Sequence, residues 1–441
     1  MIRAPWSVSL WVLVACAPPP LPAPAASRRA VPVSDVLGRW ERELPATFAG
    51  DPWAPAGPPA TAATLALRDQ FLADPRGRDG LRARQSLIGA PDAVAACAEL
   101  LDRPDAPVER RGLLLEALAA LPDALALAPL VRRLTDPDVA LRRRAAWHLG
   151  QKDATLALPD LILRLRPLYE TDDEARVWLA DAVTRLGNAT GLPVLAELTR
   201  NPALQELAGH CAMEALQRTD IAYEASEGWD VLRGRLDQLA QRLRTQPAPV
   251  LTPELRLVVV RQVRKLPSKS LRDVDEARFV LARLGAWAAA LLAECALDRD
   301  RYIRIHSLEV LGEIGPPGAV ALPAVRALLD DPLGEIYAIE VLGRMGDASA
   351  FDAMVQRLDA PRLDLRIGAL KGLAALADPR AVPLLLRRFD APTTPTEERV
   401  HAAFALARTQ REPRAIQFLE HTLAQGGYHE STLRAMLAAV R

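Results

Sequence analysis

The segment DAPRLDLRIGALKGLAALADPRAV, residues 359–382, shows how this chain folds. Its apolar residues recur at the spacing of an amphipathic helix as far as Leu373 and Ala374. The turn ADPRA follows, and an apolar second helix, AVPLLLRRF, overlaps its end. Because proline is tolerated in the first turn of a helix and aspartate caps helix starts, the segment predicts a helical hairpin.

A leucine or isoleucine, usually followed by glycine or alanine, marks the same point in unit after unit. The marks are Ile88-Gly89, Leu118-Ala119, Leu149-Gly150, Leu186-Gly187, Leu216-Gln217, Leu311-Gly312, Leu342-Gly343, Leu373-Ala374 and Leu406-Ala407. Apart from one gap, between Leu216 and Leu311, neighbouring marks keep a nearly constant spacing. This pattern predicts an all-α fold, an α-solenoid of stacked helical hairpins with a period of about 31 residues.

Composition agrees with this fold class and bears on the partners. Half of the 441 residues are apolar, but only 5% are aromatic, which suits many thin, close-packed helices. The formal net charge is zero, so no global basic field would hold DNA or RNA. We therefore expect no nucleic-acid partner.

Three segments resemble the HEAT-repeat family, in the form shared with phycobilisome-lyase-type repeats. They are DPDVALRRRAAWHLG (136–150), DRDRYIRIHSLEVLG (298–312) and the segment at 359–382. The resemblance covers roughly residues 65–220 and 280–441. It is specific for fold and says almost nothing about function.

HEAT units often carry an aspartate in a turn and an arginine several residues later. The resemblance implies that these side chains form a polar ladder between neighbouring repeats. Three pairs here share a spacing of six: Asp105 with Arg111, Asp136 with Arg142, and Asp298 with Arg304. Arg366 and Arg399 keep the arginine without the aspartate, and Glu335 reverses its charge. We therefore expect a ladder with gaps.

The first residues, MIRAPWSVSLWVLVAC, read as an export signal. The apolar run from Trp6 to Val14 is too short to cross a bilayer as a helix. The end of the run, residues 13–16, resembles the bacterial lipobox Leu-x-(Ala/Gly)-Cys. That resemblance implies a signal peptide at 1–15, lipidation of Cys16 and, because residue 17 is not aspartate, an outer-membrane lipoprotein facing the periplasm. The alternative is an ordinary secretory signal cut near Ala25.

The rest of the chain divides by composition and period. Residues 16–60 are expected to be a Pro-rich tether and N-terminal adapter segment, with one short helix in VSDVLGRWERELPATF. HEAT-like repeats follow at 61–220 and 281–441. Residues 221–280 break the period and allow two interpretations, degenerate repeats or an insertion that carries a binding feature.

No residues form a recognisable catalytic or metal-binding motif, and we find no polar constellation, so we predict no metal and no cofactor. Cys97, Cys211 and Cys295 lie in helical patterns and are expected to be small buried hydrophobes. Trp147 and Trp178 are expected in the core. Trp229 begins the aperiodic helix and is a candidate partner contact, with simple packing as the alternative.

The sequence thus favours a non-enzymatic scaffold or adapter. We expect it to bind a protein of the cell envelope and to reach the membrane through its N-terminal lipid. Two alternatives stay open: a lyase-like or cofactor-handling enzyme of the phycobilisome-lyase type, and a transient assembly or chaperone factor.

Overall fold

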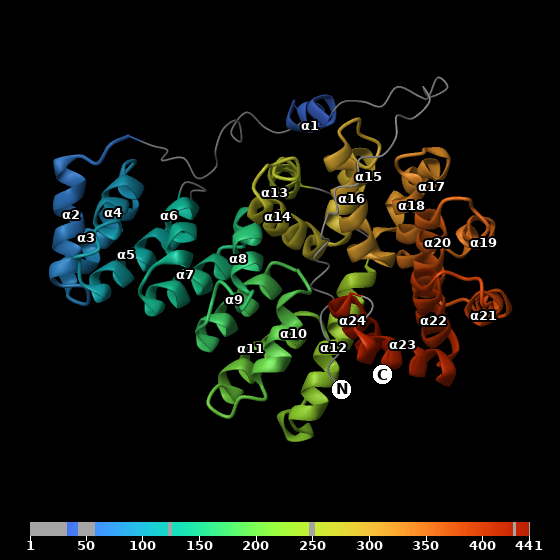
Figure 1. The fold of residues 1–441 in the computed structure, drawn as a ribbon. Coiled ribbons are helices and arrows are strands. Elements are labelled where there is room, and N and C mark those ends of the chain that lie inside the picture. The colour runs from blue at the N-terminus through green and yellow to red at the C-terminus, as the bar shows by residue number, and fades with distance from the viewer. Residues whose placement is uncertain (1–32, 43–57, 122–125, 247–251, 427–428, 441) are drawn as a thin grey trace. The chain divides into compact units, whose positions relative to one another are not determined.

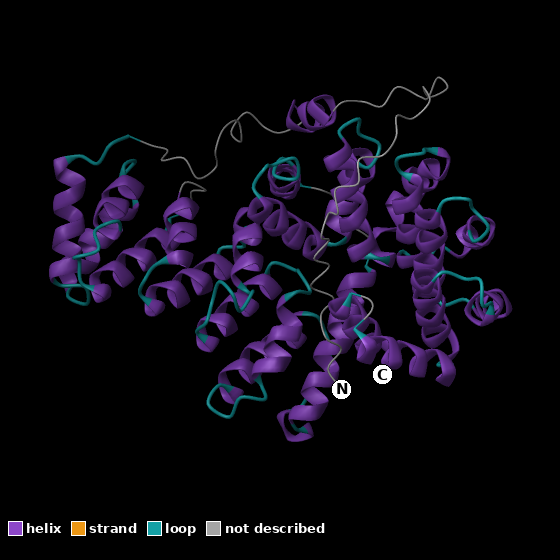
Figure 2. Cartoon of the chain, in the orientation of Figure 1, coloured by secondary structure: helices purple, strands orange, loops and turns teal. Residues whose placement is uncertain are grey.

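The structure is a computed structural model that describes residues 33–42, 58–121, 126–246, 252–426 and 429–440. Within these ranges all regular secondary structure is helical, as Figure 2 shows. The chain divides into two compact units, each described by itself below. The N-terminal unit is Leu37–Trp287, and the C-terminal unit is built mainly from Ala288–Arg441. The prediction of an all-α fold is confirmed.

The N-terminal unit contains antiparallel helical pairs that follow one another along the chain (Figure 1). Helix α1, Val33–Arg42, precedes them and realises the predicted short helix. The other helices are α2 Ala62–Ala73, α3 Arg78–Ile88, α4 Ala93–Leu101, α5 Val108–Ala120, α6 Leu127–Arg132, α7 Val139–Gln151, α8 Leu158–Arg164, α9 Asp173–Arg185, α10 Gly191–Leu198, α11 Gln205–Arg218, α12 Trp229–Thr245, α13 Pro253–Val263 and α14 Leu271–Leu284.

The C-terminal unit repeats the same arrangement. Its helices are α15 Ala286–Cys295, α16 Arg301–Ile314, α17 Leu322–Ala327, α18 Glu335–Arg344, α19 Phe351–Arg357, α20 Leu363–Leu376, α21 Val382–Asp390, α22 Thr396–Gln410, α23 Pro413–Gln425 and α24 Glu430–Val440. We call the helices that carry the leucine marks the long helices: α5, α7, α9 and α11 in the first unit, and α16, α18, α20 and α22 in the second. Successive long helices pack directly on one another, so each unit is a stretch of α-solenoid.

Aspartate side chains cap the N-termini of several long helices, as their place in the turns predicts. The Asp138 carboxylate accepts the Ala140 and Leu141 amides at the start of α7. Asp172 accepts the amide of Ala175 at the start of α9. Each such cap satisfies amide groups that have no partner inside the helix, and this fixes where the helix begins.

The leucine–glycine marks arise from close packing between long helices. Leu342 and Leu373 are fully buried. A Cβ atom on Gly343 would lie 2.2 Å from the carbonyl oxygen of Gly372 on the next long helix, α20. A Cβ atom on Gly150 would lie 2.8 Å from Cα of Ala182. Small residues therefore follow the leucine because two helix backbones meet there.

The aperiodic segment contains two kinds of structure. Helix α12 packs on α10 and α11 and continues the stack. Helices α13 and α14, which we call the fold-back hairpin, instead pack against α8 and the short 3-10 turn before it, about 100 residues earlier in the sequence. Tyr169 Oη donates to Glu276 Oε1 at 2.7 Å, and Asn188 Nδ2 donates to the carbonyl oxygen of Arg283 at 2.9 Å.

Helix α1 touches the fold-back hairpin. Leu37 and Trp40 of α1 are each only 8% exposed. The Arg256 guanidinium of α13 lies over the Trp40 ring, 5.0 Å from its centroid. Such cation–π contacts contribute on the order of 0.5–1 kcal/mol at exposed sites, and more when shielded from water. Helix α1 therefore contacts α13, in the aperiodic segment.

Candidate functional site

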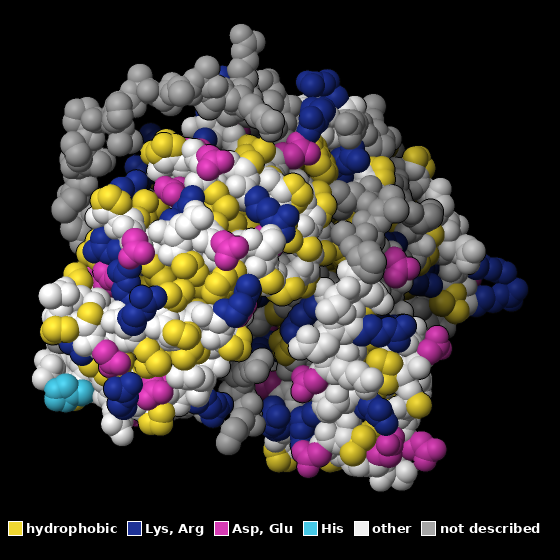
Figure 3. Space-filling view, turned by 90° about the vertical axis from the view of Figure 1, so that its right-hand side faces the viewer, with side chains coloured by type: hydrophobic (Ala, Val, Ile, Leu, Met, Phe, Trp, Pro, Cys, Tyr) yellow, Lys and Arg dark blue, Asp and Glu magenta, His cyan; other side chains and the backbone are white. Residues whose placement is uncertain are grey.

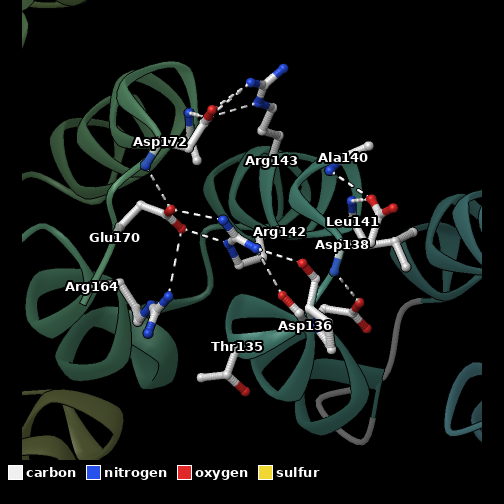
Figure 4. A network of polar contacts seen from close by, with 12 residues as sticks. Thr135, Asp136, Asp138, Ala140, Leu141, Arg142, Arg143, Arg164, Glu170 and Asp172 are labelled. Carbon is white, nitrogen blue, oxygen red and sulfur yellow. Dashed lines mark hydrogen bonds and ion pairs between the residues drawn. The ribbon is translucent and has the colours of Figure 1, made fainter. Parts of the chain in front are cut away.

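Arg142 on α7 joins its own turn to the next repeat (Figure 4). Its Nη1 donates to the carbonyl oxygens of Asp136 and Pro137, at 2.9 and 3.1 Å. Its Nε and Nη2 donate to the two carboxylate oxygens of Glu170, at 2.7 and 2.9 Å. Because this fork-to-carboxylate geometry is charge-assisted and bidentate, it is the strong form of a side-chain hydrogen bond. Arg142 therefore connects one inter-repeat turn to the next.

Arg304 and Arg366 repeat this arrangement in the C-terminal unit. Each donates to the carbonyl oxygen of the residue six positions earlier: Arg304 to Asp298 at 2.7 Å, and Arg366 to Ala360 at 2.9 Å. The spacing of six is thus set by a backbone acceptor. Since a carbonyl accepts the bond, alanine serves at position 360 as well as aspartate does at 298.

The acid of each ladder pair comes from the following repeat. The pairs are Arg111 with Asp136, Arg142 with Glu170, Arg304 with Asp331, and Arg366 with Glu398. A second arginine, from the helix that precedes the turn, also contacts three of these acids: Arg133 on Asp136 at 3.2 Å, Arg164 on Glu170 at 3.6 Å and Arg388 on Glu398 at 2.7 Å. These three carboxylates are at most 2% exposed, so removing one would leave two cations shielded from water.

The pKa of Glu170 shows how this balance works. Burial alone would raise the pKa of Glu170, but the hydrogen bonds from Arg142 and from the Asp172 amide outweigh it and hold the pKa below its ordinary value. The ladder therefore stabilises the carboxylate form.

Two of the predicted ladder aspartates lie in other environments. Asp105 is exposed and pairs with Arg103 of its own turn at 3.1 Å; the hydrogen bond from Arg103 lowers the pKa of Asp105. Its predicted place in the ladder beside Arg111 is wrong, because the carboxylate points to solvent. Asp298 is 2% exposed, and burial raises its pKa. Its Oδ1 accepts the amide of Asp300 at 2.7 Å.

A cluster of titratable side chains crosses the long helices of the C-terminal unit. We call it the Glu340 cluster; its members are Glu309, Tyr337, Glu340, Lys371 and His401. Glu309, Glu340 and Lys371 recur at the repeat period and so share one position in successive repeats. Glu340 Oε1 lies 2.6 Å from Arg344 Nη2, and its Oε2 lies 3.6 Å from Lys371 Nζ. Two cations from two helices therefore hold this carboxylate.

Every resolved pKa shift in the cluster moves away from neutral pH. Burial would raise the pKa of Glu340, but Lys371 and Arg344 outweigh it and lower the pKa. Burial and the nearby Lys371 lower the pKa of His401 to about 3. Burial, and to a smaller extent the negative charge of Glu309, raises the pKa of Tyr337. Since a general acid or base works best with a pKa near the operating pH, the cluster is suited to holding fixed charges.

The search for motifs in the sequence missed this cluster. The signal was the repeat itself, because Glu309, Glu340 and Lys371 each stand two residues before a leucine mark. A related network lies in the N-terminal unit. There Asp181 is 1% exposed, burial raises its pKa, and Arg185 Nε donates to it at 2.6 Å.

The tryptophans singled out from the sequence lie in different environments. Trp147 is 40% exposed, so its predicted place in the core is wrong; its ring meets the edge of His148 instead. Trp229 is half-buried, and a Cβ atom on Gly209 would lie 2.3 Å from its Cζ3 atom, which favours the packing alternative. Cys16 lies outside the described residues.

The three described cysteines are buried, as predicted; they are Cys97, Cys211 and Cys295. Burial raises the pKa of each thiol to about 12, so none is a thiolate at neutral pH. In the part of the chain that the structure describes, no group of three His, Cys, Asp or Glu side chains is placed to hold a metal ion. Nor does any described helix have the length and apolar run that crossing a membrane requires.

The surface of the C-terminal end carries both signs of charge. On the face in Figure 3, Lys and Arg side chains alternate with Asp and Glu, and hydrophobic side chains lie between them. This mixture agrees with the zero net charge of the whole chain.

Comparison with protein families identifies the repeat. Residues 327–400, which include α18 and α20, match the family model described as HEAT repeats. These residues are HEAT repeats. The prediction of HEAT-like repeats is thereby confirmed for these residues. Leucine marks also occur before and after the match, at Leu311 and Leu406. No curated protein matches the sequence.

Several solved structures resemble the chain weakly. Human deoxyhypusine hydroxylase is 22% identical, with 66% of this chain and 97% of that chain covered and a TM-score of 0.25. The CpcE–CpcF complex of phycocyanin lyase from Nostoc sp. PCC7120 is 15% identical, with 86% and 99% covered and a TM-score of 0.22. Kap121p is 13% identical, with 92% and 53% covered and a TM-score of 0.27. At these values the likenesses say nothing about what this chain binds.

Proposed function

We propose that this protein is a non-enzymatic HEAT-repeat scaffold or adapter that binds another protein of the cell envelope. The observation that carries the proposal is a pair of exposed apolar side chains where two successive long helices begin. Tyr302 is 63% exposed and Leu333 is 53% exposed, and they are separated by one repeat period, at one position of successive repeats.

This pair lies in register with the Glu340 cluster. Tyr302 is seven residues before Glu309, and Leu333 is seven residues before Glu340. Seven residues are about two helical turns, so Tyr302 and Glu309 fall on one side of α16, whereas Leu333 lies in the turn just before α18. Apolar anchors beside fixed charges are the usual composition of a protein-binding surface.

A cross-linked pull-down of the tagged full-length protein from solubilised envelopes tests the proposal. We expect a discrete partner with the wild type and its loss with Tyr302→Ser plus Leu333→Ser. The matched control is Val320→Ser, which removes another exposed apolar side chain (59% exposed) before α17 and should keep the partner. A partner retained by the double variant would place the contact elsewhere, and no partner at all would contradict the scaffold.

The location at the envelope is a separate part of the proposal. We propose a signal peptide at 1–15 and a lipid on Cys16 that tethers the protein to the outer membrane, facing the periplasm. Cys16→Ser should move the protein from the membrane fraction to the soluble periplasmic fraction. If the variant sediments with membranes as fully as the wild type does, the lipid is not what holds it.

Direct measurements distinguish the scaffold from the two alternative functions, a transient assembly factor and a lyase-like or cofactor-handling enzyme. A transient assembly factor would release its partner once the partner is assembled, whereas a scaffold keeps it. A lyase-like or cofactor-handling enzyme would show a bound chromophore in the visible spectrum or a metal in elemental analysis of the purified protein. Either bound group would contradict the non-enzymatic proposal.

A further inference from the structure

Two leucines protrude where the fold-back hairpin meets the regular repeats. Leu271, the first residue of α14, is 87% exposed, and Leu168, in the loop between α8 and α9, is 76% exposed. They are the most exposed large hydrophobic side chains of the described residues. Their neighbours in sequence are in contact, because the Arg272 guanidinium lies 5.7 Å from the centroid of the Tyr169 ring. We call this surface the Leu168–Leu271 patch.

The chain from the end of α13 to the start of α14, residues 264–272, is strongly basic and is called the basic loop below. Residues 264–272, RKLPSKSLR, include four basic side chains and no acidic one, in a protein whose net charge is zero. The four basic residues, all exposed, are Arg264, Lys265, Lys269 and Arg272. Asp273 follows directly and accepts a hydrogen bond from Ser268 Oγ at 3.1 Å. The exposed leucine is therefore flanked by a local excess of positive charge.

The N-terminal chain leads to the same hairpin. Trp40 of α1 lies under Arg256 of α13, the helix that ends just before the basic loop. Only sixteen residues separate Cys16 from the first residue of α1. Sixteen residues span at most roughly 50–60 Å even when fully extended. A lipid on Cys16 would therefore hold the start of α1, which contacts α13, within about that distance of the membrane surface.

We propose that the Leu168–Leu271 patch is a second membrane contact, which binds a surface of anionic lipids. The two leucines enter the headgroup region, and the basic loop binds lipid phosphates. This biological setting rests on the proposed envelope location. A lipid surface fits better than a protein partner, because the two apolar side chains protrude from separate segments and residues 264–272 hold four basic side chains, against the one acid, Asp273, that follows directly.

Sedimentation with lipid vesicles tests the proposal. The probes are vesicles of phosphatidylethanolamine with phosphatidylglycerol, and vesicles of phosphatidylcholine alone. The protein is the full chain with Cys16→Ser, so that no lipid contributes. We expect binding to the anionic vesicles that weakens as salt is added, and much weaker binding to the neutral ones.

Variants in the patch separate its two components. Arg264→Gln, Lys265→Gln and Lys269→Gln together should weaken binding to anionic vesicles by at least about tenfold. Leu168→Ser with Leu271→Ser should weaken it by about three- to tenfold. Arg272 stays unchanged because it stacks on Tyr169 and bonds Glu276.

The matched control is an exposed leucine whose arginine neighbours are mixed with acids. Leu81 is 50% exposed and follows Arg76 and Arg78, but Asp79 lies 3.7 Å from Arg82 in the same segment. The control protein carries Leu81→Ser, Arg76→Gln, Arg78→Gln and Arg82→Gln. It should bind anionic vesicles as tightly as the Cys16→Ser parent does. Circular dichroism checks that every variant folds.

Three outcomes would overturn the membrane contact. They are equal binding by the patch variants and their parent, equal binding to neutral and anionic vesicles, and loss of an envelope protein from the pull-down with vesicle binding unchanged. The last outcome would make the patch a protein-binding surface. Because these vesicle assays use the Cys16→Ser protein, their failure is distinct from a failure of the lipid anchor or of the partner pull-down.

Discussion

The contacts that hold the regular repeats join residues close in sequence, whereas those that hold the fold-back hairpin join residues far apart in sequence. Ladder pairs join residues 25 to 32 positions apart, as in Arg111 with Asp136 and Arg366 with Glu398. The fold-back hairpin is held by Arg166 with Asp275, which are 109 positions apart, and by Tyr169 with Glu276, 107 positions apart. Local contacts follow from the period of the sequence, whereas contacts of the second kind do not.

The largest effect is expected at a buried ladder acid. Glu170→Gln removes the charge that Arg142 and Arg164 share and leaves both cations uncompensated. We expect the free energy of unfolding to fall by about 3–5 kcal/mol in urea denaturation. Asp105→Asn, at an exposed acid outside the ladder, should not change it measurably. Equal free energies of unfolding for the Glu170→Gln and Asp105→Asn proteins would show that the ladder contributes little to stability.

Glycine substitutions should change stability in opposite directions at two places, the contact between α18 and α20 and the exposed side of α12. Gly343→Ala places a Cβ atom 2.2 Å from the Gly372 carbonyl oxygen and should cost about 1–3 kcal/mol of stability. Gly234→Ala, on the exposed side of α12 with no atom within 4 Å, should add about 0.5–1 kcal/mol. Thermal unfolding of both variants measures the difference. A stable Gly343→Ala protein would mean that the two long helices are farther apart than described.

Acid should weaken the regular stack through His401. The pKa of this imidazole is about 3 in the folded protein and 6.5 in its ordinary state, so below pH 6.5 the unfolded chain binds a proton that the folded protein does not. Stability is therefore lost as the pH falls from 6.5 toward 3, by about 2 kcal/mol between pH 7.5 and 5.

His401→Leu should flatten this pH dependence. The measurement is urea denaturation of both proteins at the two pH values. If His401→Leu leaves the change in unfolding free energy between the two pH values unaltered, His401 already binds its proton in the folded state near pH 6.5.

The smallest effect is expected in the fold-back hairpin. Tyr169→Phe removes the hydrogen bond to Glu276 and should cost about 1 kcal/mol. Amide hydrogen exchange should speed up in residues 253–284 and stay unchanged in α20 and α22. Tyr223→Phe, whose hydroxyl bonds the Gly228 carbonyl in its own loop, is the matched control. Faster exchange throughout the chain would mean that the hairpin and the stack open together.

The sequence predicted those parts of the structure that follow the period. The marks at Leu342 and Leu373 located the long helices, and the arginines at 142, 304 and 366 located one end of the ladder. Of the acids at the other end, Asp136 was predicted, but with the wrong arginine, and Glu170, Asp331 and Glu398 were missed, since the distance from arginine to acid varies between 25 and 32 residues. The identity of the acid varies as well, as Glu170 and Asp136 show.

The fold-back contacts could not be predicted for a different reason. Arg166 lies in the loop after α8 and Asp275 lies in α14; they share no period, and only the tertiary packing brings them together. The exposure of Leu168 and Leu271 depends on that same packing. A single sequence gives the amphipathic pattern of α13 and α14 but not the surface on which they pack.

The most direct test of the account is a cross-link across the fold-back contact. In a Cys16→Ser background, Leu168→Cys and Leu271→Cys are joined with a flexible bismaleimide; the buried cysteines, with pKa values raised to about 12, compete poorly for it. We expect rapid intramolecular cross-linking, as in a control with Tyr302→Cys and Leu333→Cys on successive repeats. Cross-linking of the control pair alone would contradict the fold-back hairpin, and the patch would no longer exist as a single surface.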